Sequence, residues 1–243
     1  MQSNHHAATL QQVNTQKKKL VSMSLKSQAL STIDHSQRIV IHTAQQDWVG
    51  SPSEGVLRKP LEKEFEESGR TTSVVQFMPG ATFDAHVHTM GEEILVLEGV
   101  FSDETGDYPA GTYIRNPPGS KHRPFSKEGC VLFVKLDYFN PNDLESVKFQ
   151  THFTPQQPGI GHLKVMSLHH FETESTALVY WPKGEHFQPH THWGGEEIFV
   201  IKGTLIDEHG RYPQGTWLKS PHMSQHNPYA VVVTLINVKT GHL

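Results

Sequence analysis

The sequence repeats itself at a fixed spacing, and this repeat limits the available folds more than any other feature. The segment E-E-I-L-V-L-E-G at 92–99 recurs as E-E-I-F-V-I-K-G at 196–203, and D-E-T-G-D-Y-P-A-G-T at 103–112 recurs as D-E-H-G-R-Y-P-Q-G-T at 207–216. Both pairs lie 104 positions apart, without a gap. We therefore expect the 243 residues to form two similar units, each with its own core.

Each copy carries three histidines and one glutamate in the same register. The two sets are His86, His88, Glu92 and His122, and His190, His192, Glu196 and His226. In a His-x-His strand both rings point to the same face and can reach one ion. Imidazole and carboxylate together bind divalent transition metals such as Zn, Fe, Mn or Ni. The sequence thus predicts one mononuclear metal site per unit and two metals per chain, the alternative being inert histidines on strands.

The glutamates occur in adjacent pairs, and only one of each pair can face the inside of a unit. Strand alternation places Glu92 on the face of Ile94 and Val96, which favours Glu92 over Glu93 as the ligand. The same reasoning favours Glu196 over Glu197 in the second unit.

Short strands separated by glycine and proline turns, with no helical period, predict a β-sandwich or barrel for each unit. We expect a flexible polar tail at 1–36 with a short helix near Leu20–Leu30, a first unit at 37–140, a linker at 141–160 and a second unit at 161–243. The first half of that linker could also pair with a sheet edge.

Composition limits the location and the partners. The net charge of −4 lacks the clustered basic residues of a nucleic-acid surface. There is no apolar run of the ~20 residues needed to cross a bilayer, and no signal-peptide core. The single cysteine, Cys130, is expected to be a buried thiol, which together with the lack of a disulfide framework favours the cytoplasm. Exposed strand edges favour a homodimer.

With these residues in place, the sequence resembles the cupins. The first unit matches the two cupin motifs at Gly80, His86, His88, Glu92, Gly99, Gly111, Pro117, Gly119 and His122. The second matches at Gly184, His190, His192, Glu196, Gly203, Gly215, Pro221 and His226, and departs at Met223, where the motif has glycine. That departure is expected to place a thioether near the second site. The resemblance implies an all-β fold of two tandem cupin (double-stranded β-helix, jelly-roll) barrels.

The amino-acid sequence of the 91–122 segment is similar to that of the cupin domain of ChrR-type anti-sigma factors. That domain in turn resembles acetylacetone-cleaving dioxygenases. This sequence lacks the Cys-x-x-Cys pair of the sigma-binding zinc domain, so direct sigma-factor inhibition is not expected. The resemblance implies either a metal-dependent oxygenase or lyase acting on a small diketone-like molecule, or a non-enzymatic sensor of oxidants or ligands. No separate general base stands out, and the catalytic residues stay unassigned.

Several other residues are weaker candidates. Aromatic and methionine side chains could line the cavities or simply pack the cores: Phe77, Phe83, Met90 and Phe125, and Phe187, Trp193, Met223 and Tyr229. Arg115 and Lys219 occupy matching positions and could meet an anionic substrate, although a surface salt bridge is the expected role. Tyr108 and Tyr212 are expected to anchor turns, and Asp103 and Asp207 to form them.

Overall fold

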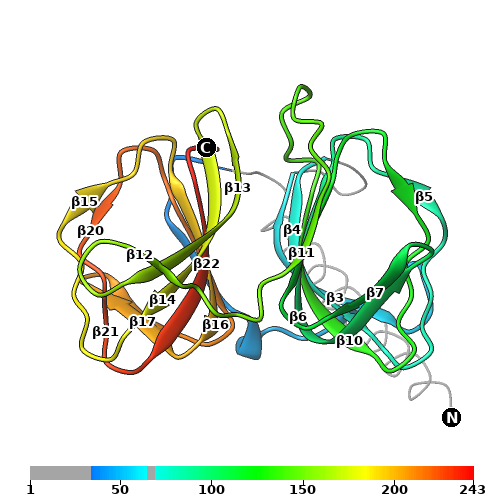
Figure 1. The fold of residues 1–243 in the computed structure, drawn as a ribbon, viewed down its shortest axis with the longest axis horizontal. Coiled ribbons are helices and arrows are strands. Elements are labelled where there is room, and N and C mark those ends of the chain that lie inside the picture. Colours follow the sequence, from blue (N-terminus) through cyan, green and yellow to red (C-terminus); the bar gives the residue numbers. More distant parts are fainter. Residues whose placement is uncertain (1–33, 65–68) are drawn as a thin grey trace, which may run out of the picture.

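The computed structural model describes residues 34–64 and 69–243, and its regular structure is almost entirely β. The helix expected near Leu20–Leu30 and nearly all of the predicted tail lie outside these residues. Within them, the one helical segment is the short 3-10 turn η1 (Thr43–Gln45). The predicted all-β fold of two tandem barrels is confirmed (Figure 1).

Each barrel is built on one large antiparallel sheet. The first sheet runs, in spatial order, β11 (Val147–Gln150), β8 (Thr112–Asn116), β6 (Glu92–Asp103), β10 (Cys130–Leu136), β4 (Thr71–Phe77), β3 (Val56–Lys63) and β2 (Val49–Gly50). The second runs β1 (Ile39–His42), β19 (Thr216–Ser220), β16 (Glu196–Lys202), β22 (Thr234–Thr240), β14 (Glu174–Trp181), β13 (Lys164–Phe171) and β12 (Gln157–Pro158).

Shorter strands close each barrel on the side away from its partner. In the first barrel these are β5 (His86–Val87), β9 (Lys121–His122) and β7 (Gly106–Pro109). In the second they are β15 (His190–Thr191), β20 (Gln225–His226), β17 (Thr204–Asp207), β18 (Gly210–Pro213) and β21 (Tyr229–Ala230). Figure 1 shows β5 at one outer edge of the molecule and β15 with β20 at the other, while the two large sheets face each other in the middle.

Successive side chains of β6 point to opposite faces of the sheet, so this strand contributes to two different cores. Ile94 and Val96 pack inside the first barrel, whereas Leu95 on the opposite face packs between the barrels. The strand continues through Gly99 to Asp103. Gly99 has φ +70°, and a Cβ at this position would lie 2.1 Å from the carbonyl oxygen of Gly129. Only glycine therefore allows the two strands to approach this closely.

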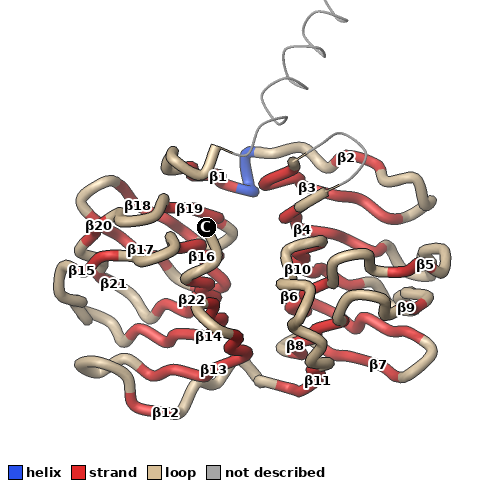
Figure 2. The backbone as a smooth tube through the Cα atoms, turned by 90° about the horizontal axis from the view of Figure 1, so that it is seen from above, coloured by secondary structure: helices blue, strands red, loops and turns tan. Residues whose placement is uncertain are grey.

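The first strand of each repeat pairs with the other barrel. β1 was expected in the first unit but pairs with β19 of the second, with Ile39 opposite Lys219. β11, within the predicted linker 141–160, pairs with β8 of the first barrel, as the alternative for that segment allowed. Within the described residues the chain therefore crosses between the barrels twice (Figure 2). The first barrel is formed by the contiguous strands β2 to β11, whereas the second combines β1 with the distant strands from β12 to β22.

The space between the two large sheets is filled by an apolar core drawn from both. Phe133 of β10 stacks on Phe199 of β16, with ring centroids 4.7 Å apart. Tyr113 and Trp217, which occupy matching positions in the repeat, are both fully buried in the same cluster. A pair of stacked aromatic rings adds about 0.5–1.5 kcal/mol beyond the burial of its area. The barrels are therefore joined by a hydrophobic interface, not only by the linker.

The same interface buries ion pairs that link the two barrels reciprocally. Lys135 Nζ of the first barrel lies 2.5 Å from Glu197 Oε2 of the second. Lys239 Nζ of the second lies 3.2 Å from Glu93 Oε2 of the first. All four residues are at most 5% exposed. The glutamates predicted to face away from the metal sites therefore hold the barrels together.

Arg115 and Lys219 also lie in this interface, so their expected role in surface salt bridges is wrong. Arg115 is 1% exposed and pairs with Asp143, while Lys219 is 0% exposed and pairs with Glu62. Neither is among the described residues that line the cavities beside the two histidine clusters. Both side chains face outward from their own barrel, and that outer face is covered by the other barrel.

Candidate metal centres

The four predicted ligands of each barrel come from two opposed elements. His86 and His122 are direct neighbours in the β5–β9 ladder, as His190 and His226 are in the β15–β20 ladder. Glu92 begins β6 of the large sheet on the opposite side. The ligand atoms of each set of four lie within 4.8 Å of one another. The structure thus brings together all eight residues that the repeat singled out.

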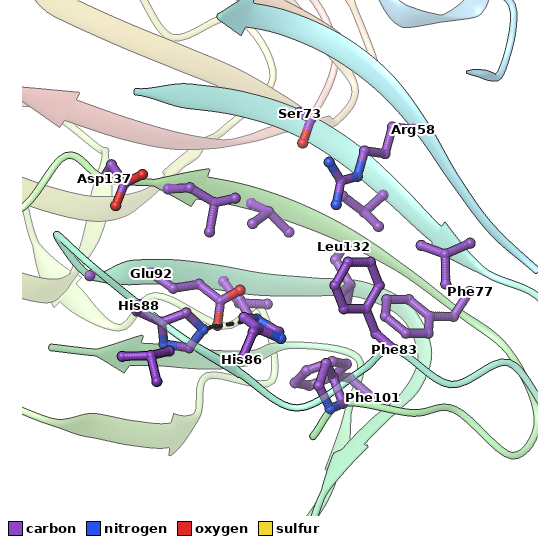
Figure 3. Close-up of a pocket in the computed structure, with 18 of the residues that line it drawn as sticks. Arg58, Ser73, Phe77, Phe83, His86, His88, Glu92, Phe101, Leu132 and Asp137 are labelled. Carbon is purple, nitrogen blue, oxygen red and sulfur yellow. Dashed lines mark hydrogen bonds and ion pairs between the residues drawn. The ribbon is translucent and has the colours of Figure 1, made fainter. Parts of the chain in front are cut away.

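In the first barrel the imidazoles of His86 and His88 lie beside the carboxylate of Glu92 (Figure 3). His88 Nε2 lies 3.2 Å from both His86 Nε2 and Glu92 Oε2. His122 Nε2 lies 3.3 Å from the same carboxylate oxygen. As predicted from alternation, Glu92 faces the cavity and Glu93 does not.

The other ring nitrogens of His86 and His88 each have a partner that sets the orientation of the ring. His86 Nδ1 lies 2.8 Å from the carbonyl oxygen of Asp84, which can only accept a hydrogen bond. Nδ1 therefore carries the proton, and the Nε2 lone pair is free to bind a cation. His88 Nδ1 lies 3.0 Å from Ser120 Oγ. Asn116 Nδ2 donates to Glu92 Oε2 at 2.9 Å and holds that carboxylate in place.

The second barrel repeats this arrangement with fewer supporting contacts. His192 Nε2 and His226 Nε2 each lie 3.5 Å from Glu196 Oε2. His190 Nδ1 lies 3.1 Å from the carbonyl oxygen of Gln188. Ser220 stands where the first barrel has Asn116, and its hydroxyl has no partner among the described residues. The second carboxylate is therefore less tightly held.

A second carboxylate stands behind the third histidine in each barrel, a role that the sequence reasoning missed. Asp207 Oδ2 lies 3.3 Å from His226 Nδ1, and Asp103 Oδ2 lies 3.6 Å from His122 Nδ1. Their other oxygens accept turn hydrogen bonds, as predicted, for example from His209 N at 2.8 Å. Each of these aspartates follows the ligand glutamate by eleven positions, which is the signal that could have identified them.

The two segments that pair with the other barrel, β1 with the residue before it and β11, supply a cation to each of these aspartates. Arg38, which directly precedes β1, donates to Asp207 Oδ2 at 2.7 Å and to the Tyr212 hydroxyl at 2.7 Å. Lys148 of β11 lies 3.4 Å from Asp103 Oδ2. Tyr212 in turn donates to Asp207 at 2.7 Å, so its predicted turn-anchoring role holds. The strand that crosses to the other barrel therefore contributes a cation that contacts the aspartate behind the third histidine of that barrel.

Burial keeps the imidazoles of His88, His122 and His192 neutral. It lowers the pKa of His88 to about 3 and that of His122 to about 4, with neighbouring histidine charges acting in the same direction. The pKa of His192 is likewise lowered to about 3. Burial also raises the pKa of Glu92 and Glu196 to about 7. Neutral imidazole is the form that binds a metal, and a nearby cation would keep both carboxylates ionised.

Buried polar atoms without partners show that these sites suit a cation. His122 Nε2, His192 Nε2 and Glu196 Oε2 have no hydrogen-bond partner among the described residues, although each is shielded from solvent. An unsatisfied buried polar atom costs about 1–3 kcal/mol. An ion among the four ligands of each barrel would satisfy the unpartnered atoms of that barrel. Three imidazoles and a carboxylate fit a divalent transition metal, and four protein ligands leave room for a further one.

Each site opens into a cavity of about 280 Å³, which is at the small end for ligand pockets. Phe77 and Phe83 line the first and Phe187 the second, as the sequence suggested. The other proposed lining residues, Met90, Phe125, Trp193, Met223 and Tyr229, line neither of these two cavities. The expected thioether beside the second site is therefore absent from its lining.

Met223 nevertheless keeps the backbone conformation of the missing glycine. Its φ is +63°, close to the +82° of Gly119 at the matching position of the first barrel. A left-handed conformation costs a residue with a Cβ about 1–2 kcal/mol. The turn before His226 therefore survives the departure from the motif, at some cost in stability.

Comparison with known proteins assigns the family. Residues 36–140 and 147–243 both match the ChrR Cupin-like domain. The chain belongs to the ChrR cupin-like family. Each match begins just before an exchanged strand, so the family unit in sequence differs from the barrel in space.

Other proteins resemble this chain in sequence over a short stretch or in fold at low identity. A DNA damage-repair/toleration protein of Arabidopsis thaliana, DRT102, is 32% identical over 88 residues, covering 32% of this chain and 28% of that protein. The chain thus spans less than a third of this relative. A Nostoc punctiforme protein provisionally described as a dioxygenase has 14% identity, a TM-score of 0.70 and coverage of 86% and 84%.

The pirin YhhW of Escherichia coli, solved with nickel(II), has 14% identity and a TM-score of 0.64, with 84% of this chain and 98% of that one covered. Likeness at this level establishes the cupin fold. Among the described residues, no helix has the length and apolar character needed to span a membrane.

Proposed function

We propose that this ChrR-like cupin binds one divalent transition metal in each barrel through three histidines and one glutamate. We further propose that it acts as a metal-dependent oxygenase or lyase on a small oxygenated, diketone-like molecule. The observation that carries the proposal is the convergence of His86, His88, Glu92 and His122 on one point of an apolar cavity. A bound metal would supply Lewis acidity toward substrate oxygens or activate dioxygen.

The residues of the chain have separate tasks in this scheme. His86, His88 and His122 hold the ion with uncharged nitrogens, and Glu92 contributes a negative charge. Ser120 and Asn116 fix two of these ligands, as described above. The apolar lining, including Phe77 and Phe101, excludes water and orients the carbon skeleton of the substrate.

Two comparisons support the proposal. The E. coli pirin binds nickel(II) in the same fold, and the Nostoc protein is provisionally a dioxygenase. The choice among Zn, Fe, Mn and Ni is left to experiment, because affinity order and cellular supply compete. We also propose a cytoplasmic location and a homodimer, to be tested by fractionation and light scattering.

A non-enzymatic sensor is the second candidate, and the lining of the first cavity gives it support. Apart from Glu92, Asp137 is the one carboxylate among the described lining residues, and its Oδ1 already accepts the Met90 N–H at 2.9 Å. The cavity thus offers no uncommitted general base. A sensor would respond to oxidation or a ligand with a change in oligomer or partner binding.

The deciding experiment measures turnover of a β-dicarbonyl panel with the protein reconstituted separately with Fe, Mn, Ni and Zn. Oxygen uptake is followed for an oxygenase, and anaerobic product formation for a lyase. We expect turnover that is lost in His86→Ala and kept in His170→Ala, a matched change at an exposed histidine of the second barrel. Turnover that survives His86→Ala and chelation would contradict the enzyme proposal. No turnover, with an oxidation-dependent change of oligomer, would favour the sensor.

A further inference from the structure

The two cavities differ in one charged side chain, although their metal-ligand sets are the same. Arg58 of β3 lines the first cavity and pairs across the sheet with Val75. In the second barrel the residue paired with Val179, which matches Val75 in the repeat, is Val165. Val165 lines the second cavity. Arginine stands in one barrel where valine stands in the other, so the fold itself does not require a charge there.

Strand pairing was needed to find this difference. The constant spacing of 104 would align Arg58 with His162 in the sequence. However, the segment that joins β3 to β4 differs in length from the segment that joins β13 to β14. The sequence repeat alone therefore did not reveal the correspondence with Val165.

The guanidinium of Arg58 is directed into the cavity and has no ion-pair partner among the described residues. Figure 3 shows it extending from its strand toward the space bordered by Ser73, Leu132 and Glu92. Its Nε is buried without a hydrogen-bond partner, and its Cζ lies 5.8 Å from the ring centroid of Phe83. Burial lowers the pKa of Arg58, with the charge of Glu92 acting in the opposite direction.

A half-buried arginine without an anionic partner destabilises the folded protein unless another group accepts hydrogen bonds from its guanidinium. A buried cation without a hydrogen-bonded anion is unfavourable, and the planar fork of arginine matches a carboxylate with two parallel hydrogen bonds. The four buried interface cations of the same protein, Arg115, Lys135, Lys219 and Lys239, each have a carboxylate partner. Arg58 is the exception, and it is the one that faces a cavity.

We propose that the first cavity takes a small carboxylate, held by Arg58 at its carboxylate end while a carbonyl or hydroxyl oxygen of the same molecule faces the metal ligands. This rests on the metal site proposed above. The second cavity, with valine at the matching position, takes an uncharged ligand or none. The two barrels thus differ in specificity while sharing a metal-binding design. A cavity of about 280 Å³ restricts the first ligand to small molecules of the 2-oxo acid type.

Calorimetric titration of the zinc-loaded protein with pyruvate tests the proposal, with hydroxyacetone as the uncharged counterpart. Zinc is redox-inert, so binding is read without turnover. We expect one equivalent of pyruvate per chain, bound at least tenfold more tightly than hydroxyacetone. Arg58→Met should weaken pyruvate binding by about 10- to 100-fold, because a hydrogen bond to a charged group is lost. It should leave hydroxyacetone unchanged. Arg58→Lys should keep part of the affinity, because the charge stays while the fork is lost.

Two controls separate this role from a structural one. Arg211→Met removes an exposed arginine of the second barrel and should bind pyruvate like the wild type. Without ligand, Arg58→Met should unfold at the same or a higher temperature than the wild type, because a half-buried charge with no ion-pair partner among the described residues is removed. A marked loss of stability would point to a structural ion pair. If the methionine variant did not fold, the lysine variant and the pyruvate-to-hydroxyacetone ratio would decide.

The outcomes also distinguish this proposal from the metal proposal. Pyruvate binding that is equal in wild type and Arg58→Met, or equal at two sites per chain, would overturn the carboxylate assignment while zinc loading stayed intact. Failure to load zinc would overturn the metal proposal instead. The affinities for pyruvate and hydroxyacetone would then be measured in the metal-free wild type and in metal-free Arg58→Met. A preference for pyruvate that is present in the wild type and lost in Arg58→Met would support the role of Arg58, and equal preferences would overturn it.

Discussion

Replacing Lys135 with methionine tests whether buried ion pairs hold the two barrels together. Lys135 Nζ lies 2.5 Å from Glu197 Oε2 and 3.0 Å from Thr72 Oγ1, and 3.9 Å from the ring centroid of Tyr138. Lys135 is 2% exposed and Glu197 3% exposed. Methionine fills much of the same volume, so the substitution removes the charge more than the packing.

The expected loss is set by the charge left behind. Removing one partner of a buried pair costs about 3–5 kcal/mol, because the remaining charge is uncompensated. Glu197 keeps two donors, Trp217 Nε1 at 2.7 Å and His242 Nε2 at 3.2 Å, so we expect the lower half of this range. For a chain of this size each kcal/mol lowers the melting temperature by about 2–4 °C, giving a drop of roughly 6–16 °C. The double variant Lys135→Met/Glu197→Gln should recover part of it, because the second change removes the unpaired charge.

Urea unfolding followed by tryptophan fluorescence and circular dichroism measures this effect. Lys183→Met, a change at an exposed turn lysine, is the matched control and should stay within about 0.5 kcal/mol of wild type. A loss below about 1 kcal/mol for Lys135→Met would refute the reasoning. So would a double variant that is less stable than the single one, since the pair would then not be the source of the loss.

Three further predictions concern the interface, the metal site and a glycine. Burial alone would raise the pKa of Glu93, but the charges of Lys239 and nearby cations outweigh it and lower the pKa to about 2. The ionised Glu93 carboxylate should therefore contribute ~3 kcal/mol to the free energy of unfolding above pH 4.5, and this contribution should be lost as the pH falls toward 2. The difference in unfolding free energy between wild type and Glu93→Gln should accordingly shrink in acid. Asp207→Asn should weaken metal binding at the second site by about 10- to 100-fold in chelator competition, and an unchanged affinity would remove its supporting role. Gly99→Ala, at φ +70° and 2.1 Å from a carbonyl oxygen, should lose more than about 2 kcal/mol by thermal denaturation, whereas Gly119→Ala, at φ +82° in open space, should lose about 1 kcal/mol, and equal losses would argue against the clash.

The parts of the fold that follow local rules could be predicted from the sequence. The spacing of 104 implied two copies of one unit, and strand alternation chose Glu92 over Glu93 as the inward carboxylate. His-x-His spacing was enough to place both rings of a pair on one face. These inferences succeed because the backbone alone sets the period of two and the direction of each side chain.

The parts that depend on the other barrel could not be predicted in this way. A surface salt bridge was expected for Arg115, because the sequence does not show that a second sheet covers that face and buries the side chain with its counter-charge. β1 has the sequence of an ordinary strand, and its pairing with the distant β19 depends on where the chain is carried in space. Arg58 was missed because the repeat spacing changes between β3 and β13, so its valine counterpart became visible only from the register of the sheets.

The metal content of the purified protein tests the central claim most directly. After loading with excess Zn, Fe, Mn or Ni and desalting, elemental analysis should find two equivalents of at least one of these metals per chain. The count should fall to one when His122 is replaced by alanine and to none when His226 is replaced as well. Wild-type protein that retained no metal after loading, or variants that retained as much as wild type, would contradict the account.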